Sequence, residues 1–127
     1  MICLIIILHF ISDWILQPRS VAKRKSSNIF WMIKHLIIIQ VVFTTLGICL
    51  KFQLMGYLLI LVNTILHGLI DWFIWRFYKK CRVGEYTKDY LDKNQYAEDY
   101  WYYFTIAIDQ ILHLCILIFI FSSAIAS

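Results

Sequence analysis

Charged residues are scarce in this chain of 127 residues. They make up 16% of it, whereas hydrophobic residues make up 61% and the mean hydropathy is +0.71. A soluble domain averages about 25% charged residues, and a chain this short cannot hide so much apolar surface from water. The same composition excludes an intrinsically disordered protein. A single membrane-embedded domain is the class that remains.

The chain also lacks paired cysteine motifs. Its four cysteines are scattered, with no C-x-x-C: Cys3, Cys49, Cys81 and Cys115. Three of them lie in apolar runs, where a cysteine behaves as a small hydrophobic residue. This pattern excludes a disulfide-stapled secreted scaffold and a site built on thiolates.

Four apolar runs are present, and they predict an all-α integral membrane four-helix bundle. The expected helices cover about 2–16, 29–50, 54–77 and 101–124. The last three have the ~20 residues that a helix needs to cross about 30 Å of hydrocarbon. The first is short, so it must sit shallow or lean on its neighbours. It has no basic residue before it and it carries His9 and Asp13, which argues against a cleaved signal peptide. The whole chain, 1–127, is therefore expected to be one transmembrane domain.

The basic residues predict an orientation. Of the twelve lysines and arginines, only Lys51 lies in the connection between the second and third runs. The others lie in or beside the loops expected at about 17–28 and 78–100. Because Lys and Arg mark cytoplasmic loops, both termini are expected on the outer side of a bacterial inner membrane. Basic clusters beside apolar runs suit a membrane protein better than a nucleic-acid-binding one, so no nucleic-acid partner is expected.

Both long loops are expected to lie at the membrane surface. The first carries four cations that either bind an anionic lipid headgroup or simply anchor the loop: Arg19, Lys23, Arg24 and Lys25. The second, about 81–100, alternates tyrosines with acidic residues and predicts an interfacial helix, with a partner-binding surface as the alternative. Membrane lipids are thus the expected partners, and a homodimer is left open because no motif fixes the oligomeric state.

Seven histidine and aspartate side chains lie inside the apolar runs, and they include every histidine of the chain. Each costs about 2.5–3.5 kcal/mol on insertion scales and indicates function by default. Three His–Asp pairs are four residues apart, which puts an imidazole and a carboxylate on one helix face. The depths of the seven predict that they converge in the cytoplasmic half of the bilayer. They are His9, Asp13, His35, His67, Asp71, Asp109 and His113.

A short internal repeat accompanies these residues. The first run reads His9-x-x-x-Asp13 and the third reads His67-x-x-x-Asp71, each followed by a tryptophan, and the second and fourth runs each add one histidine. The pattern predicts a duplicated helical hairpin with a pseudo-twofold axis along the membrane normal. Each half then supplies two histidines and one aspartate, a set that recurs in metal sites with open positions.

The cluster predicts one or two divalent ions, with zinc as the first choice and manganese or iron as alternatives. Three carboxylates close together in a low dielectric repel one another unless a cation neutralises them. Asp109 has no counterpart in the first half and is the candidate general base for a metal-bound water. These residues favour a metal-dependent hydrolase that acts on a lipid ester or lipid phosphate. A metal-ion or proton translocator and a structural or pore-forming phage-type protein are the alternatives.

Uncharged polar residues are expected to support the cluster. Gln17 is a candidate for orienting a ligand, whereas Gln40 and Asn63 are expected to hydrogen-bond between helices. Gln110 lies about 100° around the helix from Asp109, so the spacing does not require it to face the cluster.

The ordered set of polar motifs resembles a known family over nearly the whole chain. The motifs are His9-x-x-x-Asp13, Gln17, His35, His67-x-x-x-Asp71 and Asp109-Gln110-x-x-His113. They resemble the small bacterial and phage-associated membrane proteins grouped as domain of unknown function 3307, a family that implies no activity. The chain is more loosely similar to membrane-bound metal-dependent hydrolases, whose Arg-Gly-x-x-His type of motif it lacks.

Overall fold

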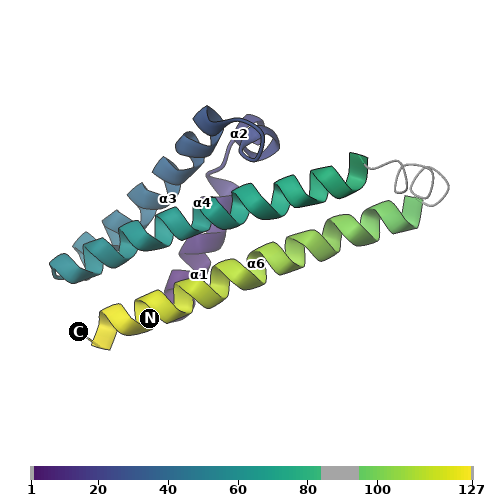
Figure 1. Cartoon of the computed structure of the whole chain (residues 1–127). Helices are drawn as coiled ribbons and strands as arrows, with labels where there is room; N and C mark the ends of the chain where they lie inside the picture. The colour runs from purple at the N-terminus through teal and green to yellow at the C-terminus, as the bar shows by residue number, and fades with distance from the viewer. Residues whose placement is uncertain (1, 84–94, 127) are drawn as a thin grey trace.

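The computed structural model describes residues 2–83 and 95–126, and these residues are helical apart from short connections (Figure 1). The helices are α1 (Ile2–Phe10), the π-helical turn η1 (Ile11–Ile15), α2 (Arg19–Arg24), α3 (Ile29–Cys49), α4 (Leu54–Val83) and α6 (Gln95–Ala126). Three segments are long and apolar enough to cross a membrane, namely Ile29–Cys49, Leu54–Lys80 and Tyr100–Ser123. The expected all-helical class is thus confirmed for the described residues.

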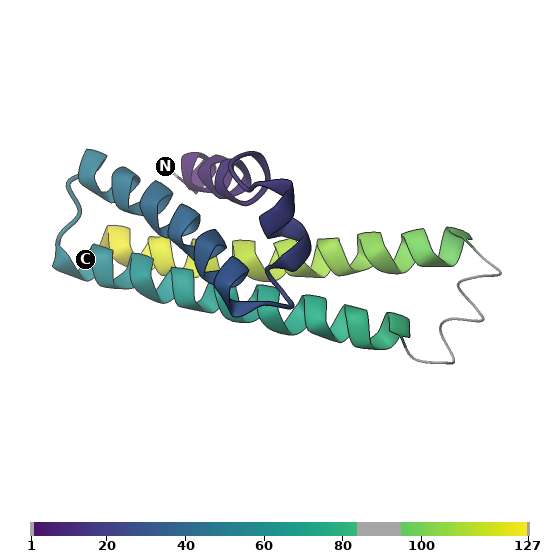
Figure 2. The same cartoon turned by 90° about the horizontal axis from the view of Figure 1, so that it is seen from above.

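The two longest helices, α4 and α6, run side by side in opposite directions (Figures 1 and 2). α3 packs on α4, α1 contacts both α3 and α6, and the short α2 packs on α3. Helix α1 begins and α6 ends toward the side where α3 turns into α4, whereas α4 and α6 extend past the other helices at their opposite ends (Figure 2). The α3–α4 turn is tight, and its Lys51 takes a left-handed backbone conformation with φ 57°.

The first apolar run differs from the single helix expected over 2–16. It changes into a π-helical turn at Ile11, where the Leu16 N–H donates to the Ile11 carbonyl at 2.9 Å. The Ser12 hydroxyl donates to the His9 carbonyl at 2.8 Å, a side-chain bond that competes with the regular backbone ladder. π-Helical turns often occur at functional sites, and this one carries Asp13.

The expected loop at about 17–28 contains the helix α2. Pro18 precedes it in an extended conformation (φ −61°, ψ 144°), which separates η1 from α2. Helix α3 then starts at an asparagine cap, because the Asn28 side chain accepts a hydrogen bond from the Phe30 N–H at 2.9 Å. The connection between the first and second apolar runs is therefore short and is ordered by helix α2 and the Asn28 cap.

The second expected loop, about 78–100, is partly helical. Helix α4 continues to Val83, and no glycine or proline lies at 78–83 to end it earlier. Helix α6 begins at Gln95, and 95–100 likewise contain neither residue. Residues 95–100 thus form the start of α6, and the rest of the interfacial helix expected at about 81–100 falls largely on 84–94, outside the described residues. Within the described part, Tyr100 and Tyr103 are exposed.

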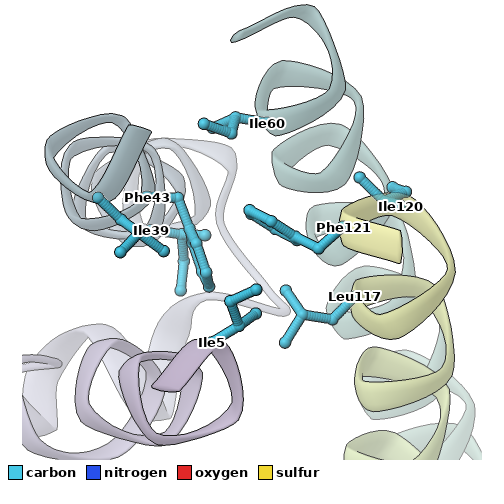
Figure 3. Close-up of a cluster of buried hydrophobic side chains, with 8 residues drawn as sticks. Ile5, Ile39, Phe43, Ile60, Leu117, Ile120 and Phe121 are labelled. Atoms are coloured by element: carbon cyan, nitrogen blue, oxygen red, sulfur yellow. The ribbon is translucent and has the colours of Figure 1, made fainter. Parts of the chain in front are cut away.

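Four helices share one apolar core (Figure 3). Its buried side chains come from α1, α3, α4 and α6: Ile5, Ile39, Phe43, Leu46, Ile60, Leu117, Ile120 and Phe121. Phe43 and Phe121 face each other with ring centroids 5.3 Å apart. In every one of these helices the core residues lie on the side nearer the α3–α4 turn, and the ionisable residues follow on the other side. The core therefore closes one end of the polar cluster.

Candidate metal centre

The seven ionisable residues singled out by the sequence are all buried, none exposing more than 4% of its surface. α1 and η1 supply His9 and Asp13, α3 supplies His35, α4 supplies His67 and Asp71, and α6 supplies Asp109 and His113. The four-residue spacing places His67 with Asp71 and Asp109 with His113 on one inward helix face, and Asp13 is buried from the turn η1. Residues more than 90 positions apart in the chain therefore meet. The structure brings the whole set together.

Four of these side chains form the largest ligand group, which we call the four-ligand set: Asp13, His35, His67 and Asp71. Each offers one ligand atom, and these atoms lie within 4.8 Å of one another. The Nε2 atoms of His35 and His67 are 2.9 Å apart. His35 Nε2 lies 3.3 Å from Asp13 Oδ1 and 3.0 Å from Asp71 Oδ2. His67 Nε2 lies 3.8 Å and 3.5 Å from the same two oxygens.

These separations match the edges of a metal coordination tetrahedron. With bonds of about 2.0–2.1 Å, the ligand atoms of tetrahedral zinc are about 3.3–3.4 Å apart. The five separations between 2.9 and 3.8 Å straddle that value. Two imidazoles and two carboxylates are also a donor set suited to zinc and to other first-row divalent ions. A divalent ion could bind among these four atoms if the Lys25 ammonium, which lies 2.8 Å from Asp71 Oδ2 and 3.2 Å from Asp13 Oδ1, moved away.

Lys25 is a member of the cluster that the sequence did not reveal. Its ammonium lies 2.8 Å from Asp71 Oδ2 and 3.2 Å from Asp13 Oδ1, and its side chain is 8% exposed. It also lies 3.4 Å from His35 Nε2. The sequence predicted that four cations of this loop lie at the membrane surface. Lys25 instead points inward, whereas Arg19 and Arg24 are exposed.

The position of Lys25 is fixed by its neighbours in the chain. The next residue, Ser26, is held by helix α4, because Arg76 Nε donates to its carbonyl at 3.1 Å and Lys79 Nζ donates to its hydroxyl at 2.7 Å. Burial lowers the pKa of the Lys25 ammonium, but the negative charges of Asp71 and Asp13 outweigh it and raise that pKa above its ordinary value. Lys25 is therefore a charged ammonium at neutral pH.

Two glutamines contact the cluster. Gln17 Nε2 lies 2.9 Å from His35 Nδ1. A metal ion on His35 Nε2 requires the ring proton on Nδ1, so the Gln17 side chain would have to turn its carbonyl oxygen to Nδ1 and accept that proton. Gln110 Nε2 donates to Asp13 Oδ2 at 3.1 Å and to Asp109 Oδ2 at 3.3 Å. Gln110 thus does face the cluster, although its spacing from Asp109 does not require this. Gln40 instead accepts from the Thr64 hydroxyl at 2.7 Å, an interhelical hydrogen bond of the kind expected for it.

With this geometry in place, comparison with known proteins identifies the family. The whole chain, residues 1–127, matches the family model described as a protein of unknown function, DUF3307. The chain belongs to this family. No curated protein and no solved structure matches it. The family resemblance carried by the His and Asp motifs is therefore confirmed, and the chemistry of the site must be inferred from the chain itself.

The ligand groups combine residues from both halves of the repeat expected from the sequence. The four-ligand set takes Asp13 and His35 from the first half and His67 and Asp71 from the second. Two further groups overlap with it: His9, His67 and His113, and Asp13, Asp109 and His113. The rings of His67 and His113 stack with centroids 3.9 Å apart, which explains how neighbouring groups share residues.

Proposed function

We propose that this protein is a membrane-embedded, metal-dependent hydrolase whose divalent ion is bound by the four-ligand set. The observation that carries the proposal is that four buried ligand atoms are separated by distances close to the edge length of a coordination tetrahedron. Zinc is our first choice for the ion, with manganese or iron as alternatives. The substrate would be a lipid ester or a lipid phosphate.

The membrane setting is part of the proposal and rests on the distribution of side chains. Large apolar residues point outward along all three long segments, with Ile48 63%, Phe73 66% and Phe119 75% exposed. Buried polar groups inside an apolar exterior are the arrangement that a bilayer favours. The proposed architecture is a four-helix bundle formed by a duplicated hairpin, with the basic end cytoplasmic and both termini outside in a bacterial inner membrane.

Asp109 is our candidate for the catalytic base. It lies in the same buried cluster, 3% exposed, and shares a ligand group with Asp13 and His113. The four-ligand set would hold a divalent ion, which would polarise the scissile group and make a nearby water more acidic. The Asp109 carboxylate would accept a proton from the attacking water, whose oxygen bonds to the carbonyl carbon or phosphorus. The ester bond to the alcohol then breaks, and the proton passes to the departing oxygen.

The apolar core favours an enzyme over a translocator. An ion or proton that crossed the membrane through the cluster would need polar groups on both sides of it. On the side toward the α3–α4 turn, the described residues between the helices include Phe43, Ile60 and Phe121, each exposing at most 1% of its surface. These side chains fill the space that a transit path would require.

The first test is the metal content of the purified full chain in detergent, measured by elemental analysis. We expect at least one equivalent of divalent metal in the wild type. The double variant Asp13→Asn/Asp71→Asn should lose it, because an amide is a poor metal ligand of similar shape. Gln40→Leu is the control, since Gln40 is a polar residue between helices outside the cluster.

Hydrolysis is then measured on lipid esters and lipid phosphates in mixed micelles. We expect activity in the wild type and in Gln40→Leu, and its loss in Asp109→Asn while metal is still bound. A wild-type protein that binds no divalent metal after reconstitution would refute the proposal. A folded, metal-loaded protein that cleaves neither class of lipid would refute its catalytic part.

A further inference from the structure

Three buried acceptor atoms beside the four-ligand set lack partners. They are Nε2 of His9, Nδ1 of His113 and Oδ1 of Asp109, and none of them has a hydrogen-bond partner among the residues that the structure describes. The three residues expose 1–3% of their surface. Leaving a buried polar atom without a partner costs about 1–3 kcal/mol, so three such atoms close together favour a bound group that contacts them.

The tautomer of His113 directs one of these atoms toward a ligand. His113 Nε2 lies 3.3 Å from the His67 carbonyl oxygen, so the Nε2–H donates to it and Nδ1 keeps a free lone pair. A hydrogen bond from the other ring nitrogen to a backbone carbonyl is the usual way in which proteins orient a metal-binding histidine. The free His113 Nδ1 lies 3.8 Å from Asp109 Oδ2.

Asp13 lies between this group and the four-ligand set. Its Oδ1 is 3.3 Å from His35 Nε2 and faces the four-ligand set. Its Oδ2 accepts from Gln110 Nε2, which also donates to Asp109 Oδ2. Asp13, Asp109 and His113 each offer a ligand atom within 4.8 Å of the others. Asp13 is therefore a member of both ligand groups, and a carboxylate has two oxygens with which it can bridge two ions.

Building on the proposed function, we infer that Asp13, Asp109 and His113 bind a second divalent ion, and that Asp13 bridges the two ions of a centre that takes a phosphate ester. Two ions held by these residues would supply positive charge to the attacking and leaving oxygens of a phosphoryl transfer. Asp109 binds through one oxygen and keeps the other for the proton of the attacking water.

The charge of the centre selects the substrate class. With neutral histidines, Asp13, Asp71 and Asp109 carry −3 and Lys25 carries +1, so the empty cluster has a formal charge of −2. One divalent ion makes it neutral, and a second leaves +2. A charge of +2 in a low dielectric requires anions, which a hydroxide and the oxygens of a phosphate ester supply. A carboxylic ester is neutral and balances less of this charge than a phosphate ester does.

The test is a Mn²⁺ titration of the full chain, stripped of metal by a chelator and followed by elemental analysis and electron paramagnetic resonance. We expect two equivalents in the wild type and the spectrum of a magnetically coupled pair. Asp109→Asn and His113→Gln should each remove the second ion and leave one equivalent with an uncoupled spectrum. Asp71→Asn should remove the ion of the four-ligand set and also leave one equivalent with an uncoupled spectrum. Gln40→Leu, the control, should keep two. Using two variants on the second site guards against a single substitution that prevents folding.

The outcomes separate the two proposals. Absence of bound Mn²⁺ and Zn²⁺ would refute the proposed function and the second site together. One equivalent in the wild type that Asp71→Asn removes and Asp109→Asn does not would leave the proposed function standing and refute the second site. A coupled pair that survives both Asp109→Asn and His113→Gln would also refute it.

The phosphate assignment is tested on the two-ion protein with inorganic phosphate and with micelles of a phosphatidate. A spectral change with both probes indicates recognition of a phosphate group on any carrier, and a change with phosphatidate alone indicates a lipid headgroup. Both outcomes support the assignment. No change with either probe would overturn it.

Discussion

The Lys25 ammonium lies 2.8 Å from Asp71 Oδ2, and this oxygen belongs to the four-ligand set. An ammonium and a divalent ion therefore compete for the same buried carboxylates. Lys25 stabilises the metal-free cluster because the aspartates would otherwise be uncompensated charges in a low dielectric. It opposes an ion in the same place through repulsion between like charges.

Lys25→Met should bind Zn²⁺ at least tenfold more tightly than the wild type, because the competing ammonium is removed while the aliphatic stem is kept. Tenfold corresponds to about 1.4 kcal/mol. Chelator competition on the detergent-purified protein measures the affinity. Lys34→Met, which removes an exposed cation of α3 and changes the net charge equally, is the control and should bind as the wild type does. Weaker binding in Lys25→Met would show that Lys25 supports the ion.

Without metal, the same Lys25→Met variant should be less stable by about 3–5 kcal/mol, the cost of removing one partner of a buried ion pair. Denaturation by SDS in mixed micelles measures the change in the free energy of unfolding. Added Zn²⁺ should restore most of the loss, since an ion supplies the missing positive charge. A metal-free variant as stable as the wild type would contradict this role of Lys25.

Gln17→Leu should weaken metal binding by 10–100-fold, the usual effect of removing a group that orients a ligating histidine. The Gln17 amide contacts His35 Nδ1 at 2.9 Å and touches the four-ligand set only through this ring. Zn²⁺ affinity measured by chelator competition gives the effect, and Gln40→Leu is the matched control on a glutamine outside the cluster. Equal losses in the two variants would point to a general packing defect.

Phe43→Ala should lower the free energy of unfolding by about 3–5 kcal/mol, because it opens a cavity in a well-packed core. Phe43 is fully buried and faces Phe121. The metal stoichiometry should stay at the wild-type value, since the core and the cluster occupy different levels of the same helices. SDS denaturation and elemental analysis on one preparation measure both. Loss of metal without loss of stability would contradict the separation of the two.

The proposed orientation can be tested with cysteine labelling in intact cells. In a background without the native cysteines, a membrane-impermeant maleimide should label Lys51→Cys and should not label Arg24→Cys until the cells are opened. Both side chains are exposed, so accessibility to the reagent reports the side of the membrane. The reverse pattern would place the basic loops outside.

The sequence by itself determined the helical class, the family and the seven ionisable residues that meet. It could do so because apolar length fixes a spanning helix and a four-residue spacing fixes a shared helix face. His67 and Asp71, for example, had to point the same way whatever lay opposite them. The hydrogen bond of Gln40 to a neighbouring helix was also expected, because a polar side chain inside an apolar run bonds to another helix.

Only the tertiary structure decided which ligands form a group and which cation balances them. Lys25 follows a short helix in a connection whose path depends on packing against α3 and on the hold of Arg76 and Lys79 on Ser26. No helical period links Lys25 to Asp71, so its inward direction leaves no mark in the sequence. The sharing of Asp13 between two groups likewise depends on where each carboxylate oxygen points, which three-dimensional packing alone determines.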